Sequence, residues 1–405
     1  MNIIVQKFGG TSVASKELRD KAVEKVIQCI QEGNQPVVVV SAMGRKGDPY
    51  ATDTLLQIGR EPYSECSSRE LDLMMACGET ISSVVFANTI KAKGYHAAAL
   101  MGFQAGIITD EKYGDADVIK VEPQNIQQLL DKGIIPVVTG FQGISENGNI
   151  TTLGRGGSDT SAAVIGEALK AEVVEIYTDV DGIMTADPRL VTNAKVIEQI
   201  DYDDIYQMAE DGAKVIHPRA VEVARRGSII LKIKNTFTDA PGTIISSFEQ
   251  YENKYSKYPS AGECITAIAH RNNVAQIVVQ YEDTAEINEV FMNALAENDI
   301  SIDMINFFID KKIFTVEEQH LVKLESIIKS IGLKYDIHRN CSKITAIGHK
   351  MRGVPGVMAR IVKALAKENI RILQTSDSHT TISCLVNSDS MEKAVNILHQ
   401  EFHLA

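Results

Sequence analysis

The stretch Ile3-Ile-Val-Gln-Lys-Phe-Gly-Gly-Thr-Ser12 decides how the fold of this chain begins. The apolar residues Ile3 to Val5 predict a strand, and Gly9 with Gly10 predicts a tight turn at its end. A parallel strand presents its carboxyl end to a ligand crevice, where glycines let backbone N–H groups approach an anion and Lys7 adds a mobile positive charge. We interpret the stretch as a phosphate-holding turn, although a plain glycine turn with a solvated lysine is the alternative for so short a motif.

Short apolar runs alternate with helical patterns along the first 235 residues. The runs Val37 to Val40, Ile134 to Val138 and Val173 to Tyr177 are typical of strands covered on both faces. Apolar residues at four-residue spacing from Leu18 to Ile30 predict an amphipathic helix. We therefore expect an α/β fold, with a mostly parallel sheet sandwiched between helix layers and ligands at the carboxyl ends of the strands.

Bulk properties limit the class of protein. A chain of 405 residues is too long for one ordinary core, and a net charge of −12 without a basic cluster argues against nucleic-acid binding. The six cysteines lack metal-binding spacing, so we expect neither structural zinc nor a disulfide framework. The start of the chain has no leader pattern, and no apolar stretch approaches bilayer length. We therefore expect a cytoplasmic protein with no membrane partner and no metal site of its own.

The pattern of the chain changes after residue 235. From 236 to 262 the residues are mostly polar and rich in turn formers, which indicates a domain boundary. We expect a catalytic domain at 1–240, a linker at 241–262 and two α+β modules at 263–340 and 341–405, whose segments could interleave.

Similar segments in the tail indicate an internal repeat. Residues 294–302 and 364–372 match as a helix end, an Asn/Asp turn and a strand start, and Ile-Thr-Ala-Ile occurs at both 265–268 and 344–347. Each copy is consistent with a small module that contains a βαβ unit, although any two βαβ segments share such features. Two tandem copies indicate a paired regulatory unit, and pairing across subunits would give at least a homodimer.

A second glycine-rich loop, Gly154-Arg-Gly-Gly-Ser-Asp159, strengthens the interpretation of the first. Its amides and the start of the following helix would face an anion, and Arg155 could bind a carboxylate or phosphate through two hydrogen bonds. A helix cap at Ser158 explains the glycines but not the arginine, and Asp159 could simply favour the helix dipole. The chain has neither a P-loop motif nor a dinucleotide fingerprint, which argues against a P-loop enzyme and a dehydrogenase.

Further charged residues lie beside predicted strand ends. Residues 178–182 and 187–189 are either plain turns or contacts to ribose, metal and phosphate. Glu79 follows Gly78 ahead of an apolar helix half, so helix capping competes with recognition of an amine. Lys214 is a candidate cation, with a solvated surface lysine as the alternative.

Together these motifs resemble the aspartate kinases of the amino-acid kinase superfamily, over essentially the whole chain. The supporting segments, in the family's order and spacing, are 7–12, 40–44, 78–79, 154–161, 178–183 with 187–189, and 212–218. The tail resembles the tandem ACT domains of such enzymes. Segments 43–50 and 376–381 are similar to the monofunctional, diaminopimelate-sensitive type.

The resemblance implies ATP-dependent phosphorylation of the side-chain carboxylate of L-aspartate to 4-phospho-L-aspartate, the first step toward lysine, diaminopimelate, methionine and threonine. Mg²⁺ would enter with ATP. The catalytic residues implied are Lys7, Asp159 and Lys214. The aspartate-binding residues implied are Ser41, Thr52, Glu79, Arg155, Gly156 and Ser158. The ATP contacts implied are Lys7, Gly9, Gly10, Thr178, Asp179, Asp187, Arg189 and Lys214. The effector contacts implied are Ser376, Asp377, His379 and Thr380, with diaminopimelate expected ahead of lysine or threonine.

Two departures from the family pattern limit what the resemblance implies. Met184 stands where many relatives carry a tyrosine near the adenine, so no stacking contact is expected there. The first ACT copy lacks a Pro-Gly turn at 280–284, whereas the second keeps Pro355-Gly356. The alternatives are a kinase of another amino-acid carboxylate and a non-catalytic ACT sensor, although a sensor would not be expected to keep the charged site residues.

Overall fold

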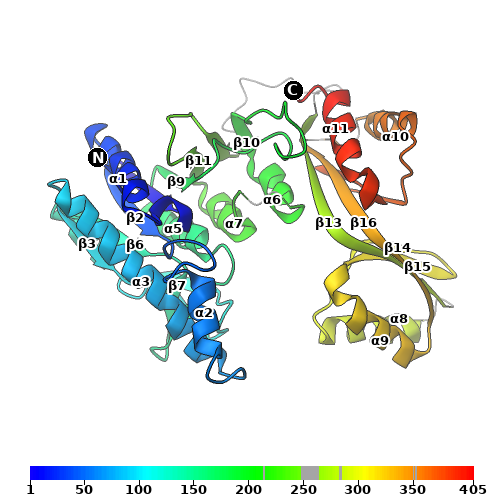
Figure 1. Ribbon diagram of the computed structural model, residues 1–405, viewed down its shortest axis with the longest axis horizontal. Coiled ribbons are helices and arrows are strands. Elements are labelled where there is room, and N and C mark those ends of the chain that lie inside the picture. The colour runs from blue at the N-terminus through cyan, green and yellow to red at the C-terminus, as the bar shows by residue number, and fades with distance from the viewer. Residues whose placement is uncertain (213–214, 248–263, 282–284, 350, 352–353) are drawn as a thin grey trace. The chain divides into compact units, whose positions relative to one another are not determined.

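The computed structural model describes residues 1–212, 215–247, 264–281, 285–349, 351 and 354–405 (Figure 1). The chain divides into two units. Unit 1 comprises Met1–Ile183, Val196–Ala209 and Lys214–Lys254, and unit 2 comprises Met184–Lys195, Glu210–Ala213 and Tyr255–Ala405. Two short segments from the first 240 residues therefore group with the tail.

Unit 1 is built on an eight-stranded sheet of order β10-β12-β11-β9-β1-β2-β6-β3. Every neighbouring pair is parallel except β11 with β12. The strands are β1 (Ile3–Phe8), β2 (Gln35–Val40), β3 (Ala97–Leu100), β6 (Ile135–Thr139), β9 (Val173–Thr178), β10 (Gln199–Asp201), β11 (Ile230–Asn235) and β12 (Thr243–Ser246). The predicted α/β class with a mostly parallel sheet is confirmed.

The run of valines in β2 explains its central place in this sheet. Val37 to Val40 are fully buried, which requires cover on both faces. Because side chains alternate along a strand, Val38 and Val40 share a core with α1 and α3, while the other two point to the face where α5 packs. The helices of unit 1 are α1 (Lys16–Gln31), α2 (Thr52–Arg60), α3 (Ser68–Ala92), α4 (Gln124–Asp131), α5 (Gly157–Leu169), α6 (Tyr202–Glu210) and α7 (Pro218–Gly227), with a 3₁₀ turn η1 (Gly10–Val13).

A smaller four-stranded sheet, of order β5-β4-β7-β8, completes unit 1. Its strand β8 packs against α3. The strands are β4 (Ile107–Thr109), β5 (Val118–Val121), β7 (Gln142–Ser145) and β8 (Ile150–Thr152).

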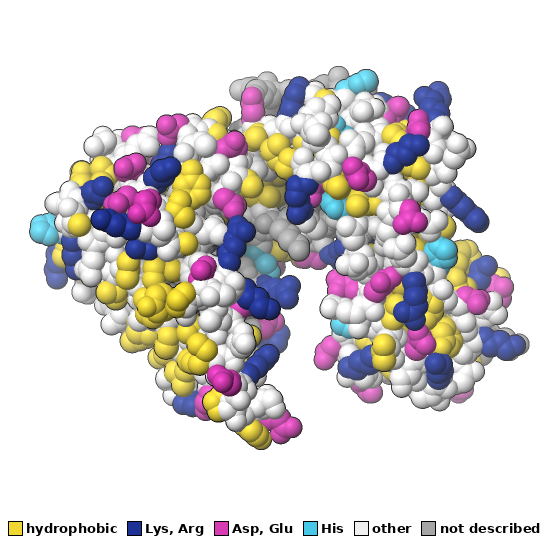
Figure 2. Space-filling view, in the orientation of Figure 1, with side chains coloured by type: hydrophobic (Ala, Val, Ile, Leu, Met, Phe, Trp, Pro, Cys, Tyr) yellow, Lys and Arg dark blue, Asp and Glu magenta, His cyan; other side chains and the backbone are white. Residues whose placement is uncertain are grey.

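Helix α3 is long and apolar enough to cross a membrane by length and composition, contrary to the expectation that no stretch approaches that length. Half of the most apolar stretch of α3 is nevertheless buried inside the protein, and the buried face of the helix carries the carboxyl groups of Asp72 and Glu79. Figure 2 shows hydrophobic side chains gathered on the face of unit 1 where α3 lies, and Leu73 and Val84 are exposed on that helix. The buried acids are consistent with a core helix of unit 1.

Unit 2 contains a six-stranded antiparallel sheet of order β14-β15-β13-β16-β18-β17. The strands are β13 (Ile265–Gln280), β14 (Asp303–Phe307), β15 (Lys311–Glu317), β16 (Lys334–Gly348), β17 (Gln374–Asp377) and β18 (Thr381–Asn387). The helices are α8 (Ala285–Glu297), α9 (Leu321–Ile331), α10 (Val357–Lys367) and α11 (Met391–Glu401), with 3₁₀ turns η3 (Glu318–His320) and η4 (Ser388–Ser390). Separate cores form under α8 with α9 and under α10 with α11.

The long strands β13 and β16 each serve both halves of unit 2. Residues 274–280 of β13 pair with β15, and the alternate residues 275, 277 and 279 lie in the core under α8 and α9, whereas Ile265 and Ile268 lie in the core under α10 and α11. The half with α8 and α9 is therefore inserted in sequence between two segments of the other half, and the halves do not simply follow each other along the chain. The expected limits of the two modules, 263–340 and 341–405, stay predictions.

The interpretation of the Ile-Thr-Ala-Ile repeat is wrong. Residues 265–268 and 344–347 lie on antiparallel neighbours within one half and are not equivalent strands of two halves. The other matched pair does occupy equivalent places, because 294–302 and 364–372 each end a helix at a left-handed residue, Asp299 or Asn369.

A buried lysine connects three segments of unit 2. Lys343 on β16 is 9% exposed, and its Nζ lies 2.8 Å from Oδ1 of Asp211 and 2.7 Å from Oδ2 of Asp303. Burial by itself lowers the pKa of Lys343, but the two carboxylates outweigh it and the pKa is raised. This ion cluster holds the residues just after α6 and the start of β14 on the sheet.

Candidate active site

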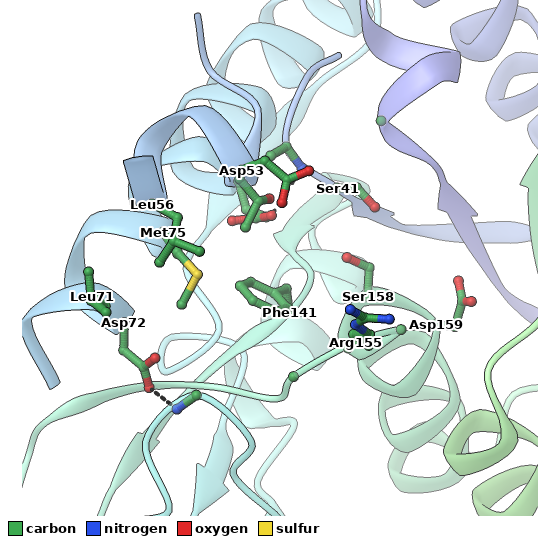
Figure 3. A pocket seen from close by; sticks show the side chains of 18 of the residues that line it. Ser41, Asp53, Leu56, Leu71, Asp72, Met75, Phe141, Arg155, Ser158 and Asp159 are labelled. Carbon is green, nitrogen blue, oxygen red and sulfur yellow. Dashed lines mark hydrogen bonds between the residues drawn. The ribbon is translucent and has the colours of Figure 1, made fainter. Parts of the chain in front are cut away.

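A cavity of about 550 Å³ opens at the carboxyl ends of β1, β2 and β6 in unit 1 (Figure 3). Its walls come from these strand ends, from α2 and α3, and from the loop that precedes α5. The predicted site residues that line it are Lys7, Gly10, Ser41, Thr52, Glu79, Arg155, Gly156, Ser158 and Asp159. The sequence therefore located both glycine-rich loops of one cavity.

Backbone contacts fix the loops at the strand ends. The N–H of Gly9 donates to β9 across 3.3 Å, and the N–H of Ser41 donates to β1 across 3.1 Å, so the sheet pairing continues beyond the strands. Gly10 packs so closely that an added Cβ would lie 2.5 Å from the carbonyl oxygen of Ala42. Only glycine fits there without a backbone shift.

Lys7 and Asp159 form an ion pair inside the cavity. Lys7 lies near the end of β1 and Asp159 in the first turn of α5, and Nζ lies 2.6 Å from Oδ1. Their side chains are 12% and 11% exposed, so water screens the pair weakly. The carboxylate fixes the position of the ammonium group, which leaves its remaining N–H groups for a ligand.

The second glycine loop presents an arginine to the same cavity. Gly156 has a φ of +67°, and an added Cβ would lie 2.2 Å from the side chain of His217, so glycine is required. Figure 3 shows Arg155, Ser158 and Asp159 together at one side of the cavity. Within the described ranges Arg155 makes no hydrogen bond or ion pair, so its guanidinium is available for a carboxylate or phosphate.

Glu79 supplies a buried carboxyl group. Its residue is 2% exposed, Oε1 accepts a 3.1 Å hydrogen bond from the N–H of Ala42, and Oε2 makes no well-formed hydrogen bond in the described part of the chain. Burial raises the pKa of Glu79 to about 7, while the amide of Ala42 and the hydroxyl of Thr52 lower it less. A buried carboxyl group whose second oxygen makes no well-formed hydrogen bond within the described residues is suited to a cationic ligand group.

Only some of the residues predicted to bind the nucleotide lie at this edge of the sheet. Thr178 ends β9 beside β1, and Asp179 follows it with its Oδ2 2.9 Å from an Arg45 guanidinium nitrogen, but neither lines the cavity. Asp187 and Arg189 belong to unit 2 and pair with each other at 2.6 Å, and the hydrogen bond from Arg189 lowers the pKa of Asp187. Lys214 lies outside the described residues.

The predicted effector residues lie on an edge of the sheet in unit 2. Ser376 and Asp377 are on β17, and His379 and Thr380 are in the turn to β18. The first three are exposed and Thr380 is half-buried. The structure thus places these residues on one accessible hairpin.

Sequence analysis missed Phe141, which lies deep in the cavity (Figure 3). It follows β6 with a φ of +71°, a left-handed conformation that is strained for a bulky side chain. Its N–H donates to Oγ of Ser161 at 3.0 Å and its carbonyl accepts from the N–H of Leu153 at 2.8 Å. The only signal in the sequence was Gly140 at the end of an apolar run.

Asp72 is the second residue that sequence analysis missed. It is fully buried on α3, and its carboxylate accepts hydrogen bonds from the N–H of Gly114 at 3.0 Å and from the N–H and hydroxyl of Thr152 at 2.8 Å each. The first of these bonds is drawn in Figure 3. Burial raises the pKa of Asp72 despite these bonds. Asp72 therefore holds the loops that form the cavity wall.

Comparison with known proteins identifies the family. The amino acid kinase family matches residues 2–235, and an ACT domain matches residues 336–400. The chain is 44% identical to aspartokinase 1 of Bacillus subtilis, with 100% of both chains covered. The chain belongs to the aspartokinases. It is also 37% identical to the aspartokinase of Geobacillus stearothermophilus, over 100% of this chain and 98% of that protein.

Solved structures agree with this assignment. Aspartokinase III of E. coli in complex with aspartate and ADP has the same fold, with a TM-score of 0.79, 24% identity and 99% of each chain covered. Aspartate kinase from Synechocystis gives a TM-score of 0.55 at 31% identity, over 99% of this chain and 70% of that one. The predicted family, fold and enzyme class, an ATP-using aspartate kinase with ACT domains, are confirmed.

Proposed function

We propose that the cavity of unit 1 is where the γ-phosphoryl group of ATP passes to the side-chain carboxylate of L-aspartate. One observation carries this proposal: the Lys7–Asp159 pair, the available Arg155 and the buried Glu79 line a single cavity. L-Aspartate offers two carboxylates and one ammonium group, and the cavity offers matching cations and a carboxyl group.

The polar groups of the cavity divide naturally between the parts of the substrate. Arg155 would bind a carboxylate of aspartate through two hydrogen bonds, and Glu79 in its charged form would bind the ammonium group. The hydroxyls of Ser41, Thr52 and Ser158 would complete the pocket, and Gly156 lets the loop pass close to the ligand. These contacts would hold the second carboxylate toward Lys7.

The chemical step needs alignment and charge neutralisation more than a base. One oxygen of the substrate carboxylate attacks the γ-phosphorus, the bond from that phosphorus to the bridging oxygen of ADP breaks, and no proton needs removal. Lys7 would neutralise the transferring group while Asp159 orients it, and the Gly9-Gly10 turn would admit phosphate oxygens to backbone N–H groups. The role of Lys214 as a second cation at the phosphates stays a prediction.

Nucleotide and metal contacts are also proposals. Thr178 and Asp179 would hold the nucleotide beside β1. The family resemblance implies that Asp187 and Arg189 also contact the nucleotide. Mg²⁺ would arrive bound to the phosphate oxygens of ATP and would offset their charge. Among the described residues, no group of three His, Cys, Asp or Glu side chains could hold a metal ion.

Regulation is proposed to occur through unit 2. Diaminopimelate, ahead of lysine or threonine, would bind near Ser376, Asp377, His379 and Thr380 and inhibit the first step toward the amino acids made from aspartate. The open edge strands β14 and β17 of the described sheet and the exposed apolar side chains of α3 are surfaces that a second subunit could cover, in support of at least a homodimer. We place the enzyme in the cytoplasm.

Trapping of the acyl phosphate tests the proposed reaction. Purified protein with Mg²⁺, ATP and L-aspartate should form a hydroxamate in the presence of hydroxylamine, and Lys7→Ala should abolish it. The control Lys120→Ala changes an exposed lysine on β5 that pairs with Glu122, and should retain activity. Product with glutamate but not aspartate would indicate another acceptor, and no product with any amino acid would favour a sensor. Adding diaminopimelate, lysine or threonine separately identifies the effector.

A further inference from the structure

Arg45 crosses the carboxyl end of β1. It lies in the loop between β2 and α2, and its guanidinium pairs with Asp179 just beyond β9 at 2.9 Å. In the strand order β9-β1-β2, β1 lies between these two anchor points. The side chain must therefore pass over the end of the strand that carries Lys7 and the Gly9-Gly10 turn.

The backbone of this loop is fixed beside the first glycine turn. The N–H of Gly44 donates to the carbonyl oxygen of Gly10 at 3.1 Å, which places the neighbouring Arg45 next to that turn. The N–H of Arg45 donates to Oδ2 of Asp48 at 2.7 Å, and Asp48 packs under Gly44, where an added Cβ would lie 2.3 Å from its carboxylate. Because the backbone is fixed and the side chain is long, the guanidinium of Arg45 can change partner without a movement of the loop.

The contact with Asp179 is easily exchanged. The side chains of Arg45 and Asp179 are 72% and 45% exposed, and an exposed ion pair of this kind contributes little to stability. A nucleotide phosphate carries more negative charge and offers several oxygens in a geometry that a guanidinium binds through two hydrogen bonds. Arg45 also neutralises a carboxylate that would otherwise repel phosphate near the turn.

We propose that Arg45 is a phosphate-binding residue that rests on Asp179 in the absence of nucleotide and moves to the phosphate oxygens of the bound nucleotide. The exchange frees Asp179 to accept hydrogen bonds from the rest of the nucleotide. This inference rests on the proposed function of the cavity. It adds to Lys7 and the predicted Lys214 a further cation, which would approach the phosphates from the loop after the neighbouring strand β2.

Binding and kinetic measurements on full-length variants test the proposal. Arg45→Ala should weaken ATP and ADP binding by about ten- to thirtyfold without weakening adenosine binding, because only the phosphates lose a charged hydrogen-bond donor. Arg45→Lys should recover part of the loss. The matched control Arg226→Ala removes an exposed arginine that pairs with Glu167 at 2.7 Å away from the cavity, and should bind all three ligands like the wild type.

Hydroxamate kinetics provide the second readout. Arg45→Ala should raise the KM for ATP with little change in the KM for aspartate. Wild-type affinity of Arg45→Ala for ATP, or an equal loss for adenosine and ATP, would overturn the role of Arg45. If the wild type binds ATP but forms no hydroxamate, the proposed function fails, and the comparison of ATP with adenosine still decides the role of Arg45.

Discussion

Protonation of Glu79 should compete with aspartate binding near neutral pH. Burial raises the pKa of Glu79 to about 7, and only the charged form attracts the ammonium group of the substrate. The apparent Kd for aspartate then scales as 1 + 10^(pKa − pH). With a pKa of about 7, aspartate should bind about tenfold more weakly at pH 6 than at pH 8.

Titration calorimetry with an unreactive ATP analogue measures this effect directly. Binding of aspartate forces Glu79 to release its proton, so about 0.9 protons should be released at pH 6 and about 0.1 at pH 8. Two buffers that differ in ionisation enthalpy separate this proton release from the heat of binding. Glu79→Gln should bind aspartate weakly with no pH slope, whereas Glu24→Gln, on the exposed face of α1, should keep the tenfold slope.

The reasoning would be refuted by a wild-type Kd that stays constant between pH 8 and pH 6. Such a result would mean either that the buried carboxyl group is already charged at pH 6 or that it does not face the ammonium group. A pH titration of the Glu79 carboxyl group in the unliganded protein, followed by NMR, distinguishes the two cases, because neither of them releases a proton on binding.

Three further predictions concern stability, each measured as a thermal midpoint. Gly156→Ala should cost more than about 2 kcal/mol because the new methyl group meets His217, whereas Gly148→Ala, with a similar φ but open space around it, should cost only about 1 kcal/mol. The raised pKa of Glu79 means that its charge destabilises the folded state above pH 7, and this cost disappears as the pH falls toward 4.5. The stability of Glu79→Gln relative to the wild type should therefore be up to about 2.5 kcal/mol greater at pH 8 than at pH 5. Lys343→Met should cost about 3–5 kcal/mol by leaving Asp211 buried without its cation, and Asp211→Asn in the same chain should restore part of the loss.

The sheet and the glycine loops of unit 1 were predictable because local features encode them. Four consecutive valines at 37–40 have few stable places other than a strand covered on both faces, and glycines mark turns such as 9–10 and 154–157. The place of the 9–10 turn follows from a general rule, since parallel strands bring their carboxyl ends to one edge, whereas 154–157 follows β8 of the smaller sheet. The pairing of Lys7 with Asp159 therefore depends on tertiary packing as well as on that rule.

Other features depend on contacts that no local pattern records. The left-handed conformation of Phe141 is fixed by hydrogen bonds to Leu153 and Ser161, which lie far along the chain. The segment that carries Asp187 groups with unit 2, although it follows a strand of unit 1 directly. The shared strands of unit 2 were misread because identical letters at 265–268 and 344–347 contain no information on strand direction.

The sharing of β13 determines which truncated subunits can exist. A polypeptide that started at an internal methionine such as Met292 or Met304 would lack all of β13, and with it a strand from each of the two cores of unit 2. Such a product would expose two sets of buried apolar side chains at once and would not form a stable regulatory chain. An independently made regulatory subunit from this sequence would have to begin before Ile265.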